Sequence, residues 1–455
     1  MKRLVLLLAF SAALLALSAQ GITEEQLAEW REATTLTGSE RAIANAVQTK
    51  GLKALAQTMQ NPIAGGTYFS HEVPSKGITD QESSGRCWLF TGLNVLRARM
   101  IKDYDLGEFT LSQVYVFFYD QLEKSNLFLQ SVIDTKDRAM DDRLVEWLFK
   151  HPLSDGGVFT GVSDLISKYG VCPSEAMPET ASANNTDVYS RLLAEKLREF
   201  GLKLRTMSSA EAAEAKKEML GEVYRLLCIC FGTPPETFSW TRTDATGKPV
   251  DTREYTPQSF YEEYIGKDLV SGYLMFMNDP SRPYYETYQI DLDRHVYDGH
   301  NWTFVNVPMD EIKEMAIESI KDSTALYMSC DVAEFYNSTT GYSDPANYDY
   351  ATLLGTDFPM NKEERIKTFA SSSTHAMTLV AVDLDEQGKP RKWKVENSWG
   401  PKAGYGGYII MSDEWLDGYL FRLVVEKKYV PSRLVKLAEK EPTMLPAWDP
   451  LFAGE

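Results

Sequence analysis

The segment SSGRCW, at Ser83–Trp88, places a cysteine directly before an apolar helical pattern. The stretch CWLFTGLNVLRARM repeats apolar residues at helical spacing, which predicts a largely buried helix with Cys87 in its first turn. Ser83, Ser84 and Gly85 are residue types that favour a helix start. The positive end of a helix dipole lowers the pKa of a thiol and favours the reactive thiolate. Cys87 is therefore the candidate nucleophile, and Arg86 beside it could add to the effect.

A thiol nucleophile needs a base, and one of the five histidines has a suitable position. His375 lies in STHAMTLVAVD, at the mouth of an apolar strand, where functional side chains collect. The alternative is a buried histidine with a structural role only. The sequence around it favours the first interpretation, because a partner for its imidazole can be found.

That partner is Asn397. The turn DEQGKP (385–390) joins predicted strands 378–384 and 392–399. In an antiparallel hairpin centred near Gln387–Gly388, Asn397 lies opposite Thr378 and within reach of His375. An amide oxygen there could set the tautomer and orientation of the imidazole, and Trp399 could cover the pair and exclude water.

The fourth element is a donor for the oxyanion that forms during acyl transfer. Gln81, six residues before Cys87, has an amide group that can serve, together with the backbone N–H of Cys87. Alone, Gln81 reads more simply as a surface loop amide. Together with a thiol, a base and an orienting amide, however, Gln81 completes the set that a cysteine peptidase needs, and it is the predicted oxyanion donor.

Three motifs, DQESSGRCW, HAMTLVAVD and VENSWG, resemble those of papain-like cysteine peptidases. The form SSGRCW resembles in particular the bleomycin hydrolase/aminopeptidase C family, and similar segments extend over roughly residues 60–455. The resemblance implies an α+β, papain-like fold. Its parts would be a helical lobe, an antiparallel β-barrel-like lobe, a large inserted helical and hairpin subdomain, and a C-terminal arm in the cleft. It also implies Cys87 as nucleophile, His375 as general base and acid, Asn397 as orienting residue and Gln81 as oxyanion donor.

The resemblance implies a cysteine aminopeptidase, with peptides as substrates. In the family the C-terminal arm presents its terminal carboxylate to the α-amino group of the substrate, a role that falls here to Glu455. Trp399 and the glycines Gly156 and Gly157 of SDGG are the other expected substrate contacts. Two alternatives stay open, an endopeptidase of the same fold and a non-catalytic binding member. The family also implies a homohexamer.

The chain divides by pattern into six expected segments. Residues 1–19 read as a signal peptide, because Lys2 and Arg3 precede an apolar run of about 14 residues, shorter than the ~20 of a spanning helix. This predicts export to a periplasm or the outside, the alternative being a membrane anchor. The remaining segments are an N-terminal helical segment (20–60), the helical lobe (61–184), the insertion (185–285), the β-rich lobe (286–430) and the arm (431–455).

Composition excludes several classes of function. The formal net charge is −18, so the chain is a poor partner for nucleic acid. No CxxC or HExxH pattern is present and no GKS or GKT follows the glycine pair, so we expect no metal, no nucleotide and no other cofactor. The four cysteines other than Cys87 are expected to be buried free thiols: Cys172, Cys228, Cys230 and Cys330.

Overall fold

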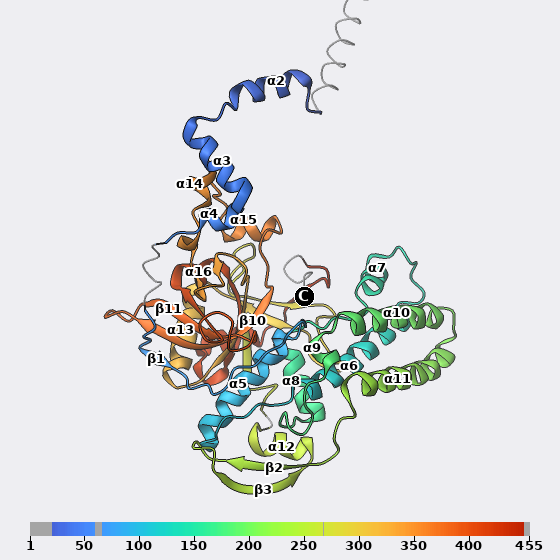
Figure 1. Ribbon diagram of the computed structural model, residues 1–455. Helices are drawn as coiled ribbons and strands as arrows, with labels where there is room; N and C mark the ends of the chain where they lie inside the picture. The colour runs from blue at the N-terminus through green and yellow to red at the C-terminus, as the bar shows by residue number, and fades with distance from the viewer. Residues whose placement is uncertain (1–20, 60–65, 267, 450–455) are drawn as a thin grey trace, which may run out of the picture. The chain divides into compact units, whose positions relative to one another are not determined.

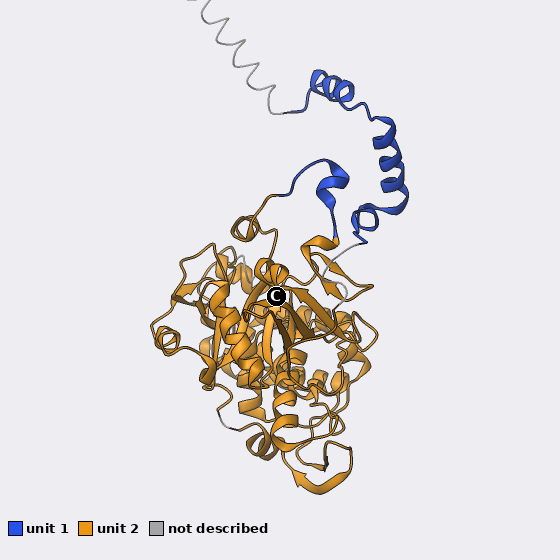
Figure 2. Ribbon diagram, turned by 90° about the vertical axis from the view of Figure 1, so that its left-hand side faces the viewer, with its two compact units in different colours: residues 1–59, 348–358 blue, residues 60–347, 359–455 orange. Residues whose placement is uncertain are grey.

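The structure is a computed structural model that describes residues 21–59, 66–266 and 268–449 (Figure 1). It divides into two compact units, residues 1–59 with 348–358, and residues 60–347 with 359–455 (Figure 2). Every described residue of the predicted site belongs to the second unit. No helix among the described residues is both long and apolar enough to cross a membrane.

The first unit is helical, as the pattern of residues 22–60 predicts. It contains α2 (Glu24–Ala33), α3 (Gly38–Lys50), α4 (Leu52–Ala56) and α14 (Tyr350–Leu354). Thr23 and Thr37 close capping boxes at the starts of α2 and α3. A bridge between Gln57 and Tyr348 joins the two chain segments of this unit.

One half of the second unit is helical. Its helices are α5 (Cys87–Tyr104), α6 (Gln113–Asp134), α7 (Arg143–Lys150), α8 (Phe159–Tyr169), α9 (Ala181–Asn184), α10 (Asp187–Leu204), α11 (Ser209–Phe231) and α12 (Pro257–Tyr264). The hairpin β2 (Phe238–Thr243) and β3 (Pro249–Tyr255) confirms the predicted turn near residues 246–249. The charged segment 188–232 forms α10 and α11, as its helical pattern predicts.

The other half is built on a sheet. Within the described residues, twelve strands form one sheet in the order β14-β5-β6-β4-β13-β7-β10-β11-β12-β9-β8, with β1 paired to β10. Most pairs are antiparallel, and three are parallel: β12 with β9, β14 with β5, and β4 with β6. The strands are β1 (His71–Glu72), β4 (Tyr273–Met277), β5 (Glu286–Ile290), β6 (Thr303–Asn306), β7 (Leu326–Cys330), β8 (Tyr336–Asn337), β9 (Tyr342–Ser343), β10 (His375–Leu384), β11 (Pro390–Glu396), β12 (Tyr408–Ser412), β13 (Leu420–Glu426) and β14 (Thr443–Leu445).

Short helices accompany this sheet. They are α13 (Met309–Lys321), α15 (Lys362–Lys367), α16 (Asp413–Tyr419) and α17 (Ser432–Ala438), with 3-10 turns η1 (Pro345–Asn347) and η2 (Lys427–Tyr429). A helical half and a sheet half with helices on its surface make the fold α+β, as predicted.

Helix α5 lies between the two halves, against α6 and α8 on one side and β7 and β10 on the other (Figure 1). Most of its residues are buried, because both faces are covered. A Cβ at Gly92 would lie 2.6 Å from Val162 Cγ2, so glycine there permits the close approach of α5 to α8. The thiol at the start of α5 is therefore held by packing on both sides.

The β10–β11 hairpin has nearly the predicted register. Val382 pairs with Trp393 as expected, but Thr378 pairs with Glu396, one residue short of the predicted partner Asn397. A bulge between Leu379 and Ala381 causes the difference, since it adds one residue to β10. The prediction was therefore right about the hairpin and wrong by one residue at its functional end.

The residues proposed to cap α5 have other partners. The helix begins at Cys87, and its N-cap, Arg86, makes no side-chain cap hydrogen bond. Ser84 Oγ instead donates to Gln81 O at 2.6 Å and accepts from Arg86 Nε at 3.0 Å. Hydrogen bonds within the turn thus hold the segment before Cys87, and the predicted cap was wrong.

A buried ion pair fixes α5 to the sheet. Arg97 Nη2 lies 2.5 Å from Glu396 Oε1, and both side chains are excluded from solvent. The same nitrogen donates to Gly77 O at 3.1 Å. Because Glu396 directly precedes Asn397, this pair ties the helix of the thiol to the strand of the orienting amide.

We expect Arg97→Met to lower the free energy of unfolding by roughly 3 kcal/mol or more, because it leaves the Glu396 carboxylate buried without its cation. Adding Glu396→Leu should restore most of the loss, since it removes the unpaired charge. Urea unfolding followed by tryptophan fluorescence measures both effects. Lys217→Met is the control, because Lys217 pairs with Glu214 on the exposed surface. An equal loss in Arg97→Met and Lys217→Met would contradict the assignment.

Candidate active site

Three of the four predicted catalytic residues line one cavity of about 410 Å³. Cys87 enters it from the start of α5, His375 from the start of β10, and Gln81 from the loop before α5. The remaining wall consists of the following residues: Gly85, Ser154, Asp155, Gly156, Gly157, Tyr327, Ser329, Ser373, Thr374, Ala376 and Arg422. Thiol, imidazole and amide thus share one cavity, although their positions in the chain lie far apart.

The imidazole of His375 is held by Asn397. Its Nε2 lies 2.8 Å from Asn397 Oδ1, and that oxygen also accepts from the backbone N–H of Ser398 at 2.8 Å. Because a backbone N–H can only donate, it identifies the amide atom as oxygen, so Nε2 carries the proton. The Nδ1 lone pair is then available as the base. The sequence predicted that Asn397 would set the tautomer, and the structure shows which tautomer it sets.

Burial sets the protonation of this ring. Desolvation lowers the pKa of His375 to about 4, and the hydrogen bond to Asn397 acts in the opposite direction. At neutral pH the resting imidazole is therefore uncharged and can accept a proton.

Trp399 packs on the His375 ring, with ring centroids 4.8 Å apart and an angle of 30° between the planes. It covers the imidazole, as expected, but it does not line the cavity, so its position does not support the expected substrate contact. Trp399 therefore shields the His375 ring from water.

Gln81 is buried and its amide is fixed at both ends. Oε1 accepts from Ser398 Oγ at 2.6 Å, and Nε2 donates to Ser84 O at 2.6 Å. An amide nitrogen has two hydrogens, so one remains for an acceptor in the cavity. The first N–H groups of a helix have no intrahelical acceptor, which makes the Cys87 N–H the natural second donor.

Arg86 does not act on the thiol. Its Nη1 lies 2.8 Å from Glu179 Oε2, and its guanidinium lies over the rings of Phe90 and Phe117. A buried cation paired with a carboxylate contributes little net charge to a neighbouring site. The suggestion that Arg86 activates Cys87 is therefore not supported by its position.

Gly156 and Gly157, which the sequence predicts to contact the substrate, lie on the cavity wall. The loop that carries them is tied to the start of α5, because Trp88 Nε1 donates to Asp155 O at 2.9 Å and Gly85 N–H donates to Asp155 Oδ2 at 2.7 Å. A Cβ at Gly85 would overlap the Asp155 carboxylate, so this contact requires glycine. Glu455, the other expected substrate contact, lies outside the described residues.

Sequence analysis missed several residues of the site. Asp155 precedes the glycine pair and pins the loop; its place in SDGG was a signal that could have been used. Arg422 is a buried arginine in the apolar strand pattern FRLVVEKKYV, lies over the Trp302 ring and lines the cavity. Ser373, two residues before His375, donates to Ser329 at 2.8 Å on the cavity wall, and nothing in the sequence marks that pair.

None of the other four cysteines lines the cavity, although Cys330 on β7 pairs with His375 in the sheet. All five cysteines belong to the described part of the chain and none forms a disulfide. Cys172 and Cys330 are buried as expected, whereas Cys228 and Cys230 are only half-buried.

A thiol and an amide-held imidazole that line one cavity, on a papain-like α+β fold, define a cysteine-type peptidase. The model of the Peptidase C1-like family matches residues 21–452, and the chain belongs to this family.

Individual relatives cover nearly the whole chain. Bleomycin hydrolase of Rattus norvegicus is 39% identical over 402 residues, which cover 85% of this chain and 88% of that protein. Aminopeptidase C of Lactobacillus delbrueckii subsp. lactis is 36% identical over 420 residues, covering 90% and 93%. The crystal structure of PepW from Lactobacillus rhamnosis HN001 superimposes with a TM-score of 0.91 at 36% identity, covering 95% of this chain and 99% of that one.

The protonation of His375 can be measured in a Cys87→Ala variant, which removes coupling to the thiol. We expect histidine side-chain NMR to show that His375 titrates near pH 4, below the ordinary value of about 6.5. Asn397→Leu in the same background should lower this pKa further, because it removes the acceptor that favours the protonated ring. A midpoint near the ordinary value, or a rise on Asn397→Leu, would be incompatible with the buried, amide-held ring.

Proposed function

We propose that this chain is a cysteine aminopeptidase, a hydrolase that removes residues from the amino end of peptides through a thioester intermediate. The observation that carries the proposal is the His375–Asn397 hydrogen bond at the cavity that Cys87 and Gln81 also line. It selects the tautomer whose free nitrogen can take the thiol proton.

The reaction follows from these groups. His375 Nδ1 takes the proton of Cys87 Sγ, and the thiolate attacks the carbonyl carbon of the scissile bond. The Gln81 amide and the Cys87 N–H donate to the oxyanion. When the C–N bond breaks, the imidazolium gives its proton to the leaving amine, and the acyl group stays on sulfur as a thioester. Water, deprotonated by the same imidazole, then attacks the thioester, and the proton returns to the thiolate.

Action at the amino end is supported by the names of the relatives and by the path of the C-terminal segment. Ala447 lines a second cavity that shares residues 154–157 with the active-site cavity. Arg282 Nη2 holds Asp449 Oδ1 at 2.6 Å, next to where the described chain ends. Six residues follow, and an extended chain of that length reaches about 20 Å. We propose that Glu455 presents its carboxylate to the substrate α-ammonium group from there.

The alternatives receive less support. A non-catalytic binding member would not need to keep the nucleophile, base, orienting amide and oxyanion donor, and all four are present. An endopeptidase of the same fold would share the whole site and differ only in the position of the C-terminal residues.

Three predictions from the sequence remain proposals. We propose that residues 1–19 are a signal peptide, that the chain is exported to a periplasm or beyond the cell, and that it forms a homohexamer. The basic start and the apolar run of about 14 residues support the first two. The family resemblance supports the third and the division into segments at residues 60, 184, 285 and 430.

The nucleophile is tested by Cys87→Ser. We expect turnover of an amino-acid anilide to fall by at least about a thousandfold, because the hydroxyl is a far weaker nucleophile at this pH. Cys228→Ser is the matched control, since Cys228 is half-buried on α11 and should keep its activity. Retained turnover in Cys87→Ser would exclude Cys87 as the nucleophile.

Specificity for the amino end is tested with paired peptides, one free and one N-acetylated. For the full-length chain we expect acetylation to lower kcat/KM at least about thirtyfold, because it removes the ammonium that faces Glu455. A chain that lacks residues 451–455 should cleave both peptides at similar rates. Product analysis by mass spectrometry shows whether single residues leave. Equal cleavage of the acetylated peptide by the full-length chain would argue for an endopeptidase.

A further inference from the structure

A second buried imidazole, that of His295, lies directly behind the active-site loop. His295 is 2% exposed and comes from the segment between β5 and β6. Its Nε2 accepts the backbone N–H of Val158 at 3.2 Å, and its Nδ1 lies 2.5 Å from Asp120 Oδ1. Because a backbone N–H can only donate, Nδ1 carries the proton and donates it to Asp120. Burial and the charge of Lys124 lower the pKa of His295, which keeps the ring in this neutral form.

The His295 ring fits between the active-site loop and α8 only because both carry glycine where they face it. A Cβ at Gly157, in the active-site loop, or at Gly161, in α8, would overlap the His295 ring. On a third side the ring packs against Trp88, the neighbour of the nucleophile, with ring centroids 4.5 Å apart. Glycine at both positions is thus explained by the imidazole that each of them faces.

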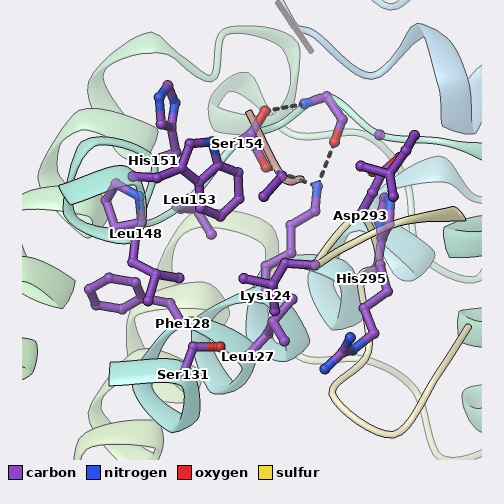
Figure 3. Close-up of a pocket in the computed structure, with 18 of the residues that line it drawn as sticks. Lys124, Leu127, Phe128, Ser131, Leu148, His151, Leu153, Ser154, Asp293 and His295 are labelled. Atoms are coloured by element: carbon purple, nitrogen blue, oxygen red, sulfur yellow. Dashed lines mark hydrogen bonds between the residues drawn. The ribbon is translucent and has the colours of Figure 1, made fainter. Parts of the chain in front are cut away.

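Lys124 completes the support. Its Nζ lies 3.1 Å from Asp120 Oδ2 and donates to Ser154 O at 3.0 Å and to Gly156 O at 2.5 Å. Figure 3 shows Lys124 reaching up to this loop from α6, with His295 on the neighbouring wall of the second cavity. The back of the loop is therefore held by donors to its carbonyl groups and by an acceptor for its N–H group.

The front of the same loop lines the cavity of Cys87 and His375. We propose that His295 is a positioning residue of the peptidase. Together with Asp120 and Lys124, it holds residues 154–158 in the conformation in which Gly156 and Gly157 present their backbone to the substrate. The inference rests on the proposed function, because it assigns His295 to substrate binding in that reaction.

The first test compares two substitutions of His295. His295→Leu replaces the ring by an apolar side chain and removes both hydrogen bonds. We expect KM for an unblocked dipeptide amide to rise about tenfold, which corresponds to about 1.4 kcal/mol of binding free energy. The value of kcat should stay within about threefold, since the loop binds the ground state and the transition state alike. His295→Gln, whose amide can both donate and accept, should recover most of the KM.

Two controls accompany this test. His300→Gln removes a histidine of the same segment that also pairs with an aspartate, Asp164, away from the cavity, and should leave KM unchanged. The alkylation rate of Cys87 by iodoacetamide should be unchanged in every variant, because the small reagent does not need the loop. A kcat loss without a KM change in His295→Leu, or equal KM values in the Leu and Gln variants, would overturn the proposal.

The second test displaces the His295 ring by a substitution at Gly161, which does not line the cavity. Gly161→Ala should raise KM in the same way, because its methyl group displaces the ring, while Gly221→Ala, at an open helix position, should not. In a His295→Ala background, Gly161→Ala should have little further effect, since the overlap has gone. Full additivity of the two changes would contradict the proposal, and this test stands if His295→Leu does not fold.

The result also separates this inference from the proposed function. If wild-type protein shows no Cys87-dependent turnover, the peptidase assignment itself fails. If turnover depends on Cys87 but neither His295 nor Gly161 controls KM, only the role of His295 fails.

Discussion

The packing of α5 against β10, together with its ion pair to the end of β11, is the constraint on which the site depends. Thr378 Oγ1 on β10 donates to Thr91 O on α5 at 3.4 Å, and Arg97 on α5 pairs with Glu396 at the end of β11. Thr378 lies three residues after His375 and Glu396 directly precedes Asn397. The surface that buries the helix therefore also sets the position of the imidazole–amide pair relative to the thiol, and a shift of the helix would change stability and chemistry together.

Two buried histidines show how surroundings assign a role to the same side chain. His375 uses one nitrogen on a neutral amide and keeps the other for the cavity, whereas His295 uses both nitrogens on the protein. The partners also differ in charge. The neutral Asn397 amide orients the His375 ring without a charge that favours its protonated form, whereas the charged Asp120 carboxylate accepts a hydrogen bond from the His295 ring. The surroundings of His375 therefore suit proton transfer, whereas those of His295 suit structural support.

Local patterns predicted the helix at Cys87 and the β10–β11 hairpin that brings His375 and Asn397 together, because spacing and turn chemistry act over a few residues. They missed local irregularities that no pattern marks, since a bulge moved Thr378 by one position and the Ser84 hydroxyl bonds within the turn. They also failed where long-range contacts decide: Glu179 pairs with Arg86 and keeps it from the thiol. Asp155, His295 and Arg422 were missed for the same reason, since each gains its place in the site from a partner far away in the sequence.

The central claim is that this packing makes one of five thiols reactive. Brief exposure to iodoacetamide at about pH 5.5, followed by digestion and mass spectrometry, measures each cysteine separately, and half-buried Cys228 and Cys230 serve as internal standards. An ordinary thiol, with a pKa of about 8.5, reacts slowly at that pH. The predicted result is label on Cys87 well ahead of the other four. Labelling of Cys87 no faster than that of Cys228 or Cys230 would contradict it.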